Sequence, residues 1–430
     1  MNIVDHQKKI SPEKTILEYD VAIIGGGPAG MIAAGRAAEL GAKVVLIEKN
    51  SNLGKKLLIS GGGRCNLTNV EPDTRKFLSA FKEAQGFLFS PFSKFSIRDT
   101  IEFFEQHGCP IKIEAENRAF PTTDNSKSVL DALVAYMREG NVEIMRGKAV
   151  VRLHTADDGT ILEAVLAGAV HIKAKSFILA TGGTSHPETG STGDGWKWME
   201  TLGLNVKTDG FALVPVKTKE SWTHQLQGLS YPTAKMTVFQ NDEKKFSVKG
   251  KFLFTHFGVS GPMVLNASRD ISDILSYGTT TLSIDLFPTM DAGTLDRKIQ
   301  EIFKLNQNKK FKNSLGELVM PTLMEALIVR TKIDPEKEVN IVSREERLLV
   351  TNFLKDIRMT VTGFSDQSEA IVASGGVNME EIDTRTMQSK KIPNLYLVGD
   401  MLDVNRPSGG YSLQLCWTTG YVAGEAAAKN

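Results

Sequence analysis

Cysteine is scarce in this chain. Its 430 residues include three cysteines, Cys65, Cys109 and Cys416, with no Cys-x-x-Cys pair and no spacing typical of metal ligands. Disulfide frameworks and cysteine-based metal sites need more cysteines at closer spacings. We therefore expect no metal site, and a protein of the reducing cytoplasm. Cys65 lies in a glycine-rich loop without a partner cysteine, so we expect its role to be structural rather than redox.

Long apolar runs and an excess of one charge are also missing. No stretch approaches the roughly 18 apolar residues that a membrane-spanning helix needs. Residues 1–18 have no apolar core and do not resemble a signal peptide, so we expect an N-terminal extension. Lys and Arg total 51 against 50 Asp and Glu, a net charge of +1. This balance favours a small-molecule substrate over nucleic acid or a membrane, and it says nothing about oligomeric state.

What the chain does contain is a dinucleotide-binding pattern in Tyr19–Asn50. An apolar run leads into Gly25-x-Gly27-x-x-Gly30, an alanine-rich stretch follows, and a second apolar run ends at Glu48. This order predicts a strand, a tight turn, a helix and a second strand followed by an acid. Gly27 lets the backbone approach a pyrophosphate, and Glu48 offers a carboxylate to ribose hydroxyls. The fold class we predict is α/β, with a Rossmann-type domain.

Three further segments indicate which dinucleotide is bound. The loop 54–69 combines Lys56 with three consecutive glycines and Arg64, which suits an anion or a flat ring, although a flexible surface loop has a similar composition. Thr181-Gly182 ends an apolar strand and allows a close approach. Gly399-Asp400 ends another, where a carboxylate binds sugar or ribityl hydroxyls. Gly409-Gly410 opens a last helix whose N-terminus favours negative charge, and this pattern favours a flavin over a nicotinamide.

The alternation of strands and helices is interrupted once. We predict a discontinuous FAD-binding domain of residues 19–205 and 353–430. The interruption is predicted to hold a β-rich subdomain over 206–290 and a helical one over 291–352.

These segments resemble the BaiN/RdsA family of NAD(P)/FAD-dependent oxidoreductases. The resemblance spans nearly the whole chain, and its most specific stretch is SGGGRCNLTN. It implies an FAD-binding fold of the glutathione-reductase-like type with an inserted β-barrel-like part and a helical part. The matching stretches are Asp20–Glu48, Gly54–Asn69, Arg118–Pro121, Ala180–Gly195, Phe252–Pro262, Ala373–Val377 and Asn394–Gly424.

The motifs and the resemblance together give the expected contacts of FAD. At two positions the chain departs from the family pattern: Asp400 stands where glutamate is usual, and Ser412 follows Gly-Gly-Tyr where asparagine is usual. The expected contacts are Gly25, Gly27, Pro28, Ala29, Gly30, Glu48, Lys49, Lys56, Ser60, Gly61, Gly62, Arg64, Cys65, Asn66, Thr68, Val150, Thr181, Gly182, Gly399, Asp400, Gly409, Gly410, Tyr411, Ser412 and Gln414.

Flavin chemistry needs a proton donor beside the cofactor, for which the candidates are His256, Tyr411 and His186. A second dinucleotide motif is missing, so NAD(P)H either docks transiently as electron donor or the substrate itself supplies the electrons. The resemblance makes ene reduction and amine oxidation the reactions to consider. Two alternatives stay open: a flavin-containing RNA-binding or RNA-modifying protein, suggested by the basic loop and Asn308–Lys312, and an FAD-binding protein without specific turnover.

Overall fold

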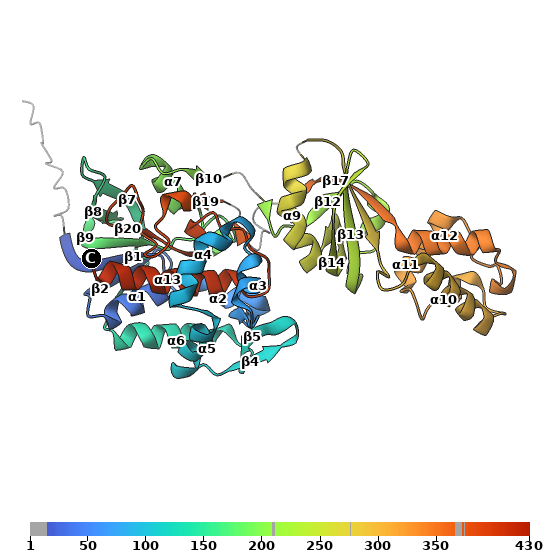
Figure 1. Cartoon of the computed structure of the whole chain (residues 1–430), viewed down its shortest axis with the longest axis horizontal. Helices are drawn as coiled ribbons and strands as arrows, with labels where there is room; N and C mark the ends of the chain where they lie inside the picture. The colour runs from blue at the N-terminus through green and yellow to red at the C-terminus, as the bar shows by residue number, and fades with distance from the viewer. Residues whose placement is uncertain (1–14, 209–210, 276, 366–371, 374) are drawn as a thin grey trace, which may run out of the picture. The chain divides into compact units, whose positions relative to one another are not determined.

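The computed structural model describes residues 15–208, 211–275, 277–365, 372–373 and 375–430. Most of the expected N-terminal extension and one residue of the Ala373–Val377 motif lie outside this set. The chain divides into a first unit, Met1–Asp209 with Ala373–Asn430, and a second unit, Gly210–Val372 (Figure 1).

A mostly parallel sheet is the centre of the first unit. Its strands run in the order β6-β2-β1-β9-β8-β7, and β20 also pairs with β9. The pairs β1–β2, β1–β9, β2–β6 and β20–β9 are parallel. Every residue of β2 is buried, as expected for a parallel strand covered on both faces. The bounds are β1 Thr15–Ile24, β2 Val44–Glu48, β6 Glu143–Arg146, β7 Val150–Thr155, β8 Ile161–Leu166, β9 Val170–Leu179 and β20 Leu395–Leu397.

Helices α1 (Pro28–Glu39) and α13 (Tyr411–Ala428) lie side by side in Figure 1. They come so close because α13 carries glycine at the contact. A Cβ on Gly420 would lie 2.4 Å from Ala29 O, and one on Gly424 would lie 2.4 Å from Ala33 O. Helix α13 is therefore fixed against α1, and its N-terminal Gly410 lies against Thr68.

The other elements of the first unit surround this sheet. β3, β5 and β4 form a small separate sheet, and α5 begins with a capping box in which Ser96 and Asp99 bond each other's backbone. The bounds are α2 Lys55–Ile59, η1 Ser60–Gly63, β3 Thr68–Asn69, α3 Thr74–Ser79, η2 Lys82–Ala84, α4 Gln85–Lys94, α5 Ile97–Gln106, β4 Ile111–Glu114, η3 Ala115–Asn117, β5 Arg118–Pro121, α6 Ser126–Glu139, η4 Pro187–Thr189, α7 Asp194–Thr201, β10 Val206–Lys207, β19 Gly376–Val377, η8 Met379–Glu381 and η9 Gly399–Met401.

The second unit contains a closed barrel in the order β12-β15-β14-β13-β16-β17. Along β13, Ala234, Met236 and Val238 are buried while the residues between them are partly exposed, which is the alternation of a strand with one core face. The bounds are β11 Phe211–Ala212, β12 Val216–Thr218, α8 Ser221–His224, β13 Ser230–Gln240, β14 Glu243–Thr255, β15 Gly258–Ser260, α9 Pro262–Leu275, β16 Thr280–Asp285, α10 Ala292–Leu305, η5 Phe311–Asn313, α11 Pro321–Thr331, η6 Val339–Ile341, α12 Arg344–Lys355, β17 Ile357–Phe364 and β18 Val372–Ala373.

The structure moves one predicted boundary. β17 pairs with β12 and β16 and closes the barrel, so residues 353–364 belong to the second unit rather than to the FAD-binding part. Helices α10 to α12 lie between β16 and β17 in sequence and share one apolar core with the barrel, so the β-rich and helical parts are not two consecutive blocks. The alternating pattern of β17 suits a strand in either unit, and only its pairing partners decide where it belongs.

Candidate functional site

The glycines of the β1–α1 turn have different neighbours. Gly25 has φ +114°, and a Cβ there would lie 2.4 Å from Ala180 O. A Cβ on Gly30 would lie 2.0 Å from Gly25 O, so both positions are closed by the protein's own backbone. Gly27 has an ordinary φ of −84°, and a Cβ there would meet nothing within 4 Å. Neither backbone conformation nor crowding explains why position 27 is glycine. The open side of Gly27 is available to a ligand.

Two helix N-termini lie near the predicted cofactor motifs: α1 begins at the turn after β1, and α13 begins beside Asn66 and Thr68 of the glycine-rich loop. Neither α1 nor α13 has a side-chain cap or an acidic residue in its first turn. Their positive dipole ends are therefore not neutralised locally, which favours an anionic ligand at each. Pro28 is the first residue of α1, where it costs no helical hydrogen bond, and Ala29 is buried behind it.

Glu48 sits at the end of β2 with its carboxylate directed at the glycine turn. Its Oε2 accepts from Gly26 N (2.7 Å), and its Oε1 accepts from Asn50 N (2.7 Å). The start of β7 is brought to the same place, because Lys148 N donates to Glu48 O (3.0 Å) two residues before Val150. Lys49 extends outward to Asp194 Oδ2 (2.8 Å). The expected contacts of an adenosine half are thus gathered at one strand end.

The glycine-rich loop packs against the start of α13. Gly61, Gly62 and Gly63 all have positive φ (56°, 68° and 85°), a conformation that explains three consecutive glycines. The amide of Asn66, oriented to satisfy its neighbours, accepts from Gly410 N (3.2 Å) and donates to Thr68 O (3.0 Å). Ser60 Oγ donates to Leu57 O (2.7 Å) within the loop itself.

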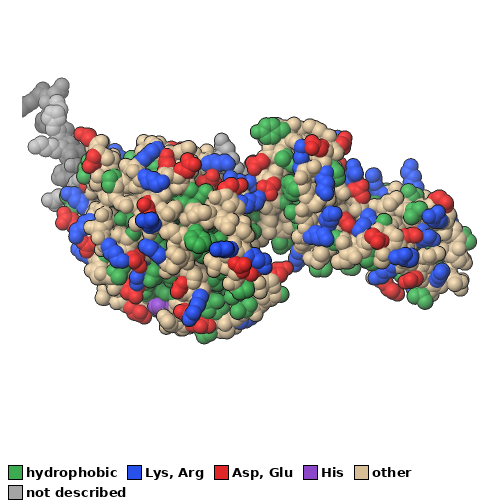
Figure 2. Space-filling view, viewed as in Figure 1, with side chains coloured by type: hydrophobic (Ala, Val, Ile, Leu, Met, Phe, Trp, Pro, Cys, Tyr) green, Lys and Arg blue, Asp and Glu red, His purple; other side chains and the backbone are tan. Residues whose placement is uncertain are grey.

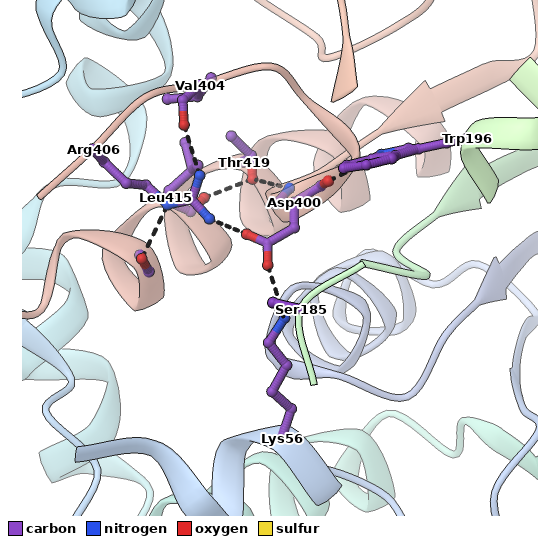
Figure 3. Close-up of polar contacts among 10 residues, drawn as sticks. Lys56, Ser185, Trp196, Asp400, Val404, Arg406, Leu415 and Thr419 are labelled. Carbon is purple, nitrogen blue, oxygen red and sulfur yellow. Dashed lines mark hydrogen bonds and ion pairs between the residues drawn. The ribbon is translucent and has the colours of Figure 1, made fainter. Parts of the chain in front are cut away.

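Asp400 is the centre of a charged network drawn in Figure 3. It follows β20, its side chain is 13% exposed, and it forms ion pairs with Arg406 through Oδ1 and with Lys56 Nζ through Oδ2 (3.1 Å). Lys56 Nζ also donates to Ser185 Oγ (2.6 Å). Burial alone would raise the pKa of Asp400, but the charges of Arg406 and Lys56 lower it to about 2. The carboxylate is therefore ionised at neutral pH.

Backbone positions around Asp400 are fixed from three directions. Trp196 Nε1 donates to Asp400 O (3.2 Å), and Gly399 N donates to Thr419 Oγ1 (3.0 Å). Thr181 Oγ1 approaches Met401 Sδ (3.0 Å), which ties the end of β9 to the turn after β20. Gly182 follows with φ +75°, and Gly409 has φ +104° with nothing within 4 Å of a Cβ.

Three predicted contact residues point elsewhere. Arg64 pairs with Glu114 and Asp124 and lies over the Phe120 ring (4.2 Å to the centroid). The Cys65 side chain is buried in the core, and burial raises the pKa of its thiol to about 12. Gln414 is fully buried and donates to Thr100 Oγ1 (2.8 Å) on α5. These side chains have partners within the first unit, and a contact of the three residues with FAD stays a prediction.

Each proton-donor candidate has its own local setting. The Tyr411 ring stacks on Phe77 (4.7 Å between centroids), and burial raises the pKa of its hydroxyl. His186 has a left-handed backbone, and its Nδ1 lies 2.9 Å from Glu188 Oε1. His256 is exposed in the β14–β15 turn of the second unit, where its ring contacts Phe257. Within the first unit, Tyr411 opens α13 next to Ser412, and His186 directly follows Ser185, which bonds Lys56.

Sequence reasoning missed Arg406 and Ser185. Arg406 stands between a predicted carboxylate and the Gly409-Gly410 turn, and an arginine in such a short link could have drawn attention as a charge partner for Asp400. Nothing in its spacing shows that its side chain is buried, because loops have no periodicity from which to read a face.

The arrangement suits the expected flavin dinucleotide. It offers an open glycine beside a helix N-terminus for phosphates, the carboxylates of Glu48 and Asp400 for hydroxyl groups, and Lys56 as a cation. Thr68 Oγ1 is buried, and no described residue gives it a hydrogen-bond partner. Over the part of the chain that the structure describes, no cluster of side chains suits a metal ion, and no helix has the length and apolar character needed to cross a membrane.

Comparison with known proteins identifies the family. The family described as "HI0933-like protein Rossmann domain" matches residues 19–426, so the chain belongs to it. A ribosomal RNA dihydrouridine synthase of Escherichia coli is 30% identical over 409 residues, covering 95% of this chain and 97% of the relative. A 3-dehydro-bile acid delta(4,6)-reductase of Clostridium scindens is 30% identical over 420 residues, with coverages of 95% and 99%.

Solved structures agree in fold. A 3-ketosteroid-delta4-(5alpha)-dehydrogenase of Rhodococcus jostii superposes with a TM-score of 0.53 at 15% identity, covering 98% of this chain and 99% of the other. The predicted family, the Rossmann-type FAD-binding fold and the class of FAD-dependent oxidoreductase are confirmed.

Proposed function

We propose that this member of the HI0933-like family reduces a carbon–carbon double bond conjugated to a carbonyl group in a small organic substrate, with NAD(P)H as electron donor. One observation carries the proposal: the two full-length relatives are named for different substrates but for the same change of bond. A delta(4,6)-reductase saturates double bonds, and a dihydrouridine synthase makes a uracil ring with its double bond saturated. Both relatives align with nearly the whole of this chain, and both names describe saturation of a carbon–carbon double bond. We therefore propose the same type of reduction for this protein.

The residues of the first unit have separate tasks in this proposal. FAD, when bound, supplies hydride transfer. Glu48, Lys56 and Asp400 would hold its hydroxyls and phosphates, and the open side of Gly27 would admit the pyrophosphate to α1. A proton must also reach the substrate carbon opposite the hydride. Tyr411 and His186 in the first unit, and His256 in the second, remain our candidates for it.

The decisive experiment combines absorption and anaerobic reduction. The purified protein should show a flavin spectrum, bleach with NADH or NADPH, and regain its colour when a conjugated enone is added. A panel of a 3-oxo-4,6-diene bile acid, a simple cyclic enone, uridine and a primary amine separates ene reduction from amine oxidation. Protein without bound flavin that takes up no added FAD would contradict the proposal. If flavin is bound but neither a nicotinamide donor nor a substrate reduces it, the protein binds FAD without turnover.

Proton-donor variants refine the reaction. Tyr411→Phe, His186→Gln and His256→Gln should each leave the bleaching by NAD(P)H intact, because hydride transfer to the flavin needs none of them. Loss of the true donor should slow reoxidation by the enone by about 100-fold, the usual contribution of a general acid. Equal reoxidation in all three would remove every candidate named here.

The second candidate function is action on uracil in RNA, favoured by the name of the Escherichia coli relative. The basic run 308–312 no longer supports it, because Lys310 and Lys312 both pair with Glu336. On the face shown in Figure 2, basic and acidic side chains are interspersed, as expected from the net charge of +1.

A different group of lysines gives this candidate a test. Lys235 lies directly opposite Lys249 on β13 and β14, and Lys251 follows two residues later on β14. Within the described part of the chain none of the three forms an ion pair, and facing like charges destabilise a sheet. If this face binds single-stranded RNA, changing all three lysines to glutamine should weaken the salt dependence of binding. The negative slope of log affinity against log salt concentration should become shallower by about 2. The same change at Lys298, Lys304 and Lys309 is the control, and equal slopes would exclude the barrel face.

A further inference from the structure

Arg406 is a buried arginine that connects the turn after β20 to the first turn of α13. Its side chain is 1% exposed. One terminal nitrogen pairs with Asp400 Oδ1, the other donates to Val404 O (2.7 Å), and Nε donates to Ser412 Oγ (3.0 Å). Asp400 belongs to the turn after β20 and Ser412 to the first turn of α13, as Figure 3 shows for the Asp400 side. The guanidinium is thus a rigid link between the two segments.

The charge of this link does not fit a purely structural role. Lys56 and Arg406 supply two positive charges to the carboxylate of Asp400, and a second carboxylate near Lys56, that of Glu188, is 61% exposed and screened by solvent. The N-terminus of α13 adds its own partial positive charge, and a cation at that end of a helix is unfavourable. Burying a charge in such a place costs free energy that an apolar side chain would not cost. An anionic ligand at this position would offset the excess.

Arg406 is the shared partner of two groups from different segments. The Asp400 carboxylate and the Ser412 hydroxyl are both bonded by it. A planar guanidinium that bonds through three nitrogens is suited to fix both groups.

We propose that Arg406 is a positioning residue of the cofactor site, which holds the Asp400 carboxylate and the Ser412 hydroxyl for FAD and, with Lys56, gives the site net positive charge. This inference rests on the proposed assignment of the FAD site to these residues. It predicts effects on cofactor affinity and on the potential of the bound flavin, neither of which requires the substrate to be known.

The test compares Arg406→Gln and Arg406→Lys with Arg98→Gln, a control on the exposed face of α5 whose side chain is 86% exposed. FAD affinity is measured by fluorescence quenching after removal of bound flavin. We expect Arg406→Gln to weaken binding at least tenfold, because a buried charged hydrogen bond is lost. Arg406→Lys keeps the charge but loses the planar set of three donors, so it should weaken FAD binding less than Arg406→Gln does. Arg98→Gln should leave FAD binding unchanged.

A second measurement separates positioning from folding. Loss of a positive charge near the flavin should make its two-electron reduction less favourable, and a tenfold change in the equilibrium corresponds to about 30 mV. Lysine at 406 should keep the wild-type potential although its affinity is lower. If Arg406→Gln does not fold, Ser412→Ala and Arg406→Lys provide the affinity measurement. Wild-type affinity in both of these would overturn the proposal.

The double variant Asp400→Glu/Arg406→Gln gives the sharpest result. Without the arginine the longer acid should recover part of the lost affinity, whereas Asp400→Glu alone should weaken binding because Arg406 already fills that space. Additive losses would show that Arg406 does not position the carboxylate. If the wild-type protein binds no FAD, the proposed site itself fails and this inference with it. If the wild type and Arg406→Gln bind equally, with equal potentials, only the inference fails.

Discussion

Gly258 and Gly261 of the barrel turn have different neighbours from Gly27 and Gly409, which lie at two helix N-termini of the first unit. In the barrel turn of the second unit, a Cβ on Gly258 would lie 2.2 Å from Val216 O, and one on Gly261 would lie 2.9 Å from Lys251 O. These glycines are needed by the barrel's own backbone. In the first unit, Gly27 and Gly409 meet nothing within 4 Å. A crowded glycine serves the fold, whereas an open one beside a helix N-terminus, such as Gly27 or Gly409, leaves space for a ligand.

The largest expected effect is that of a crowded glycine. Gly30→Ala places a methyl group 2.0 Å from Gly25 O, and the backbone must move to admit it. We expect a loss of about 3 kcal/mol in the free energy of unfolding, typical of severe overpacking. Urea unfolding followed by circular dichroism measures it. A Gly30→Ala protein as stable as the wild type would contradict the distinction between crowded and open glycines.

The charged network predicts a pH dependence confined to the first unit. Because the folded pKa of Asp400 is lowered to about 2, its contribution is present above the unfolded value near 4 and is lost as the pH falls toward 2. Lowering the pKa of this largely buried carboxyl from near 4 to about 2 corresponds to about 2 kcal/mol of folding stability. Unfolding free energies between pH 5 and pH 2.5 should fall less steeply in Asp400→Asn than in the wild type. Parallel curves would show that Asp400 is not the responsible group.

Substitution of an open glycine should weaken ligand binding without lowering the stability of the fold. Gly27→Ala should weaken FAD binding about tenfold, which is 1.4 kcal/mol, and change unfolding stability by no more than about 0.5 kcal/mol. Equilibrium dialysis with FAD and thermal unfolding without it give the two values. A stability loss like that of Gly30→Ala would mean that position 27 also serves the fold.

The smallest effect is chemical and compares the two units directly. All three cysteines lie in the first unit and none in the second. Burial raises the pKa of Cys65 and Cys416 to about 12 and that of Cys109 to about 11. Cys65 and Cys109 are buried and should not react with iodoacetamide at pH 8 in the folded protein, whereas Cys416 is partly exposed. Labelling of Cys65 and Cys109 along a urea titration would then report unfolding of the first unit alone, and their rapid labelling without urea would contradict their burial.

The two units also differ in how far the sequence predicts them. The turn at Gly25–Gly30 and the acid at Glu48 are local, because the residues that define them are neighbours along the chain or lie one βα unit apart. The same holds for Asp400 at a strand end. Arg406 could not be placed, since its orientation depends on how a loop closes over Asp400. β17 was assigned to the wrong unit because its partners, β12 and β16, are distant in sequence. The role of Gln414 stays a prediction, because α13 is apolar around most of its surface and its pattern does not show which face meets a ligand.

The pairing of α1 with α13 has a consequence for biosynthesis. Lys56 and Asp400 are 344 residues apart, and Asp400 is linked through Arg406 to Ser412 in the first turn of α13. A growing chain therefore has its dinucleotide turn long before it has the other half of the site. A chain that stops before α13 would contain the turn but not the helix that packs on it.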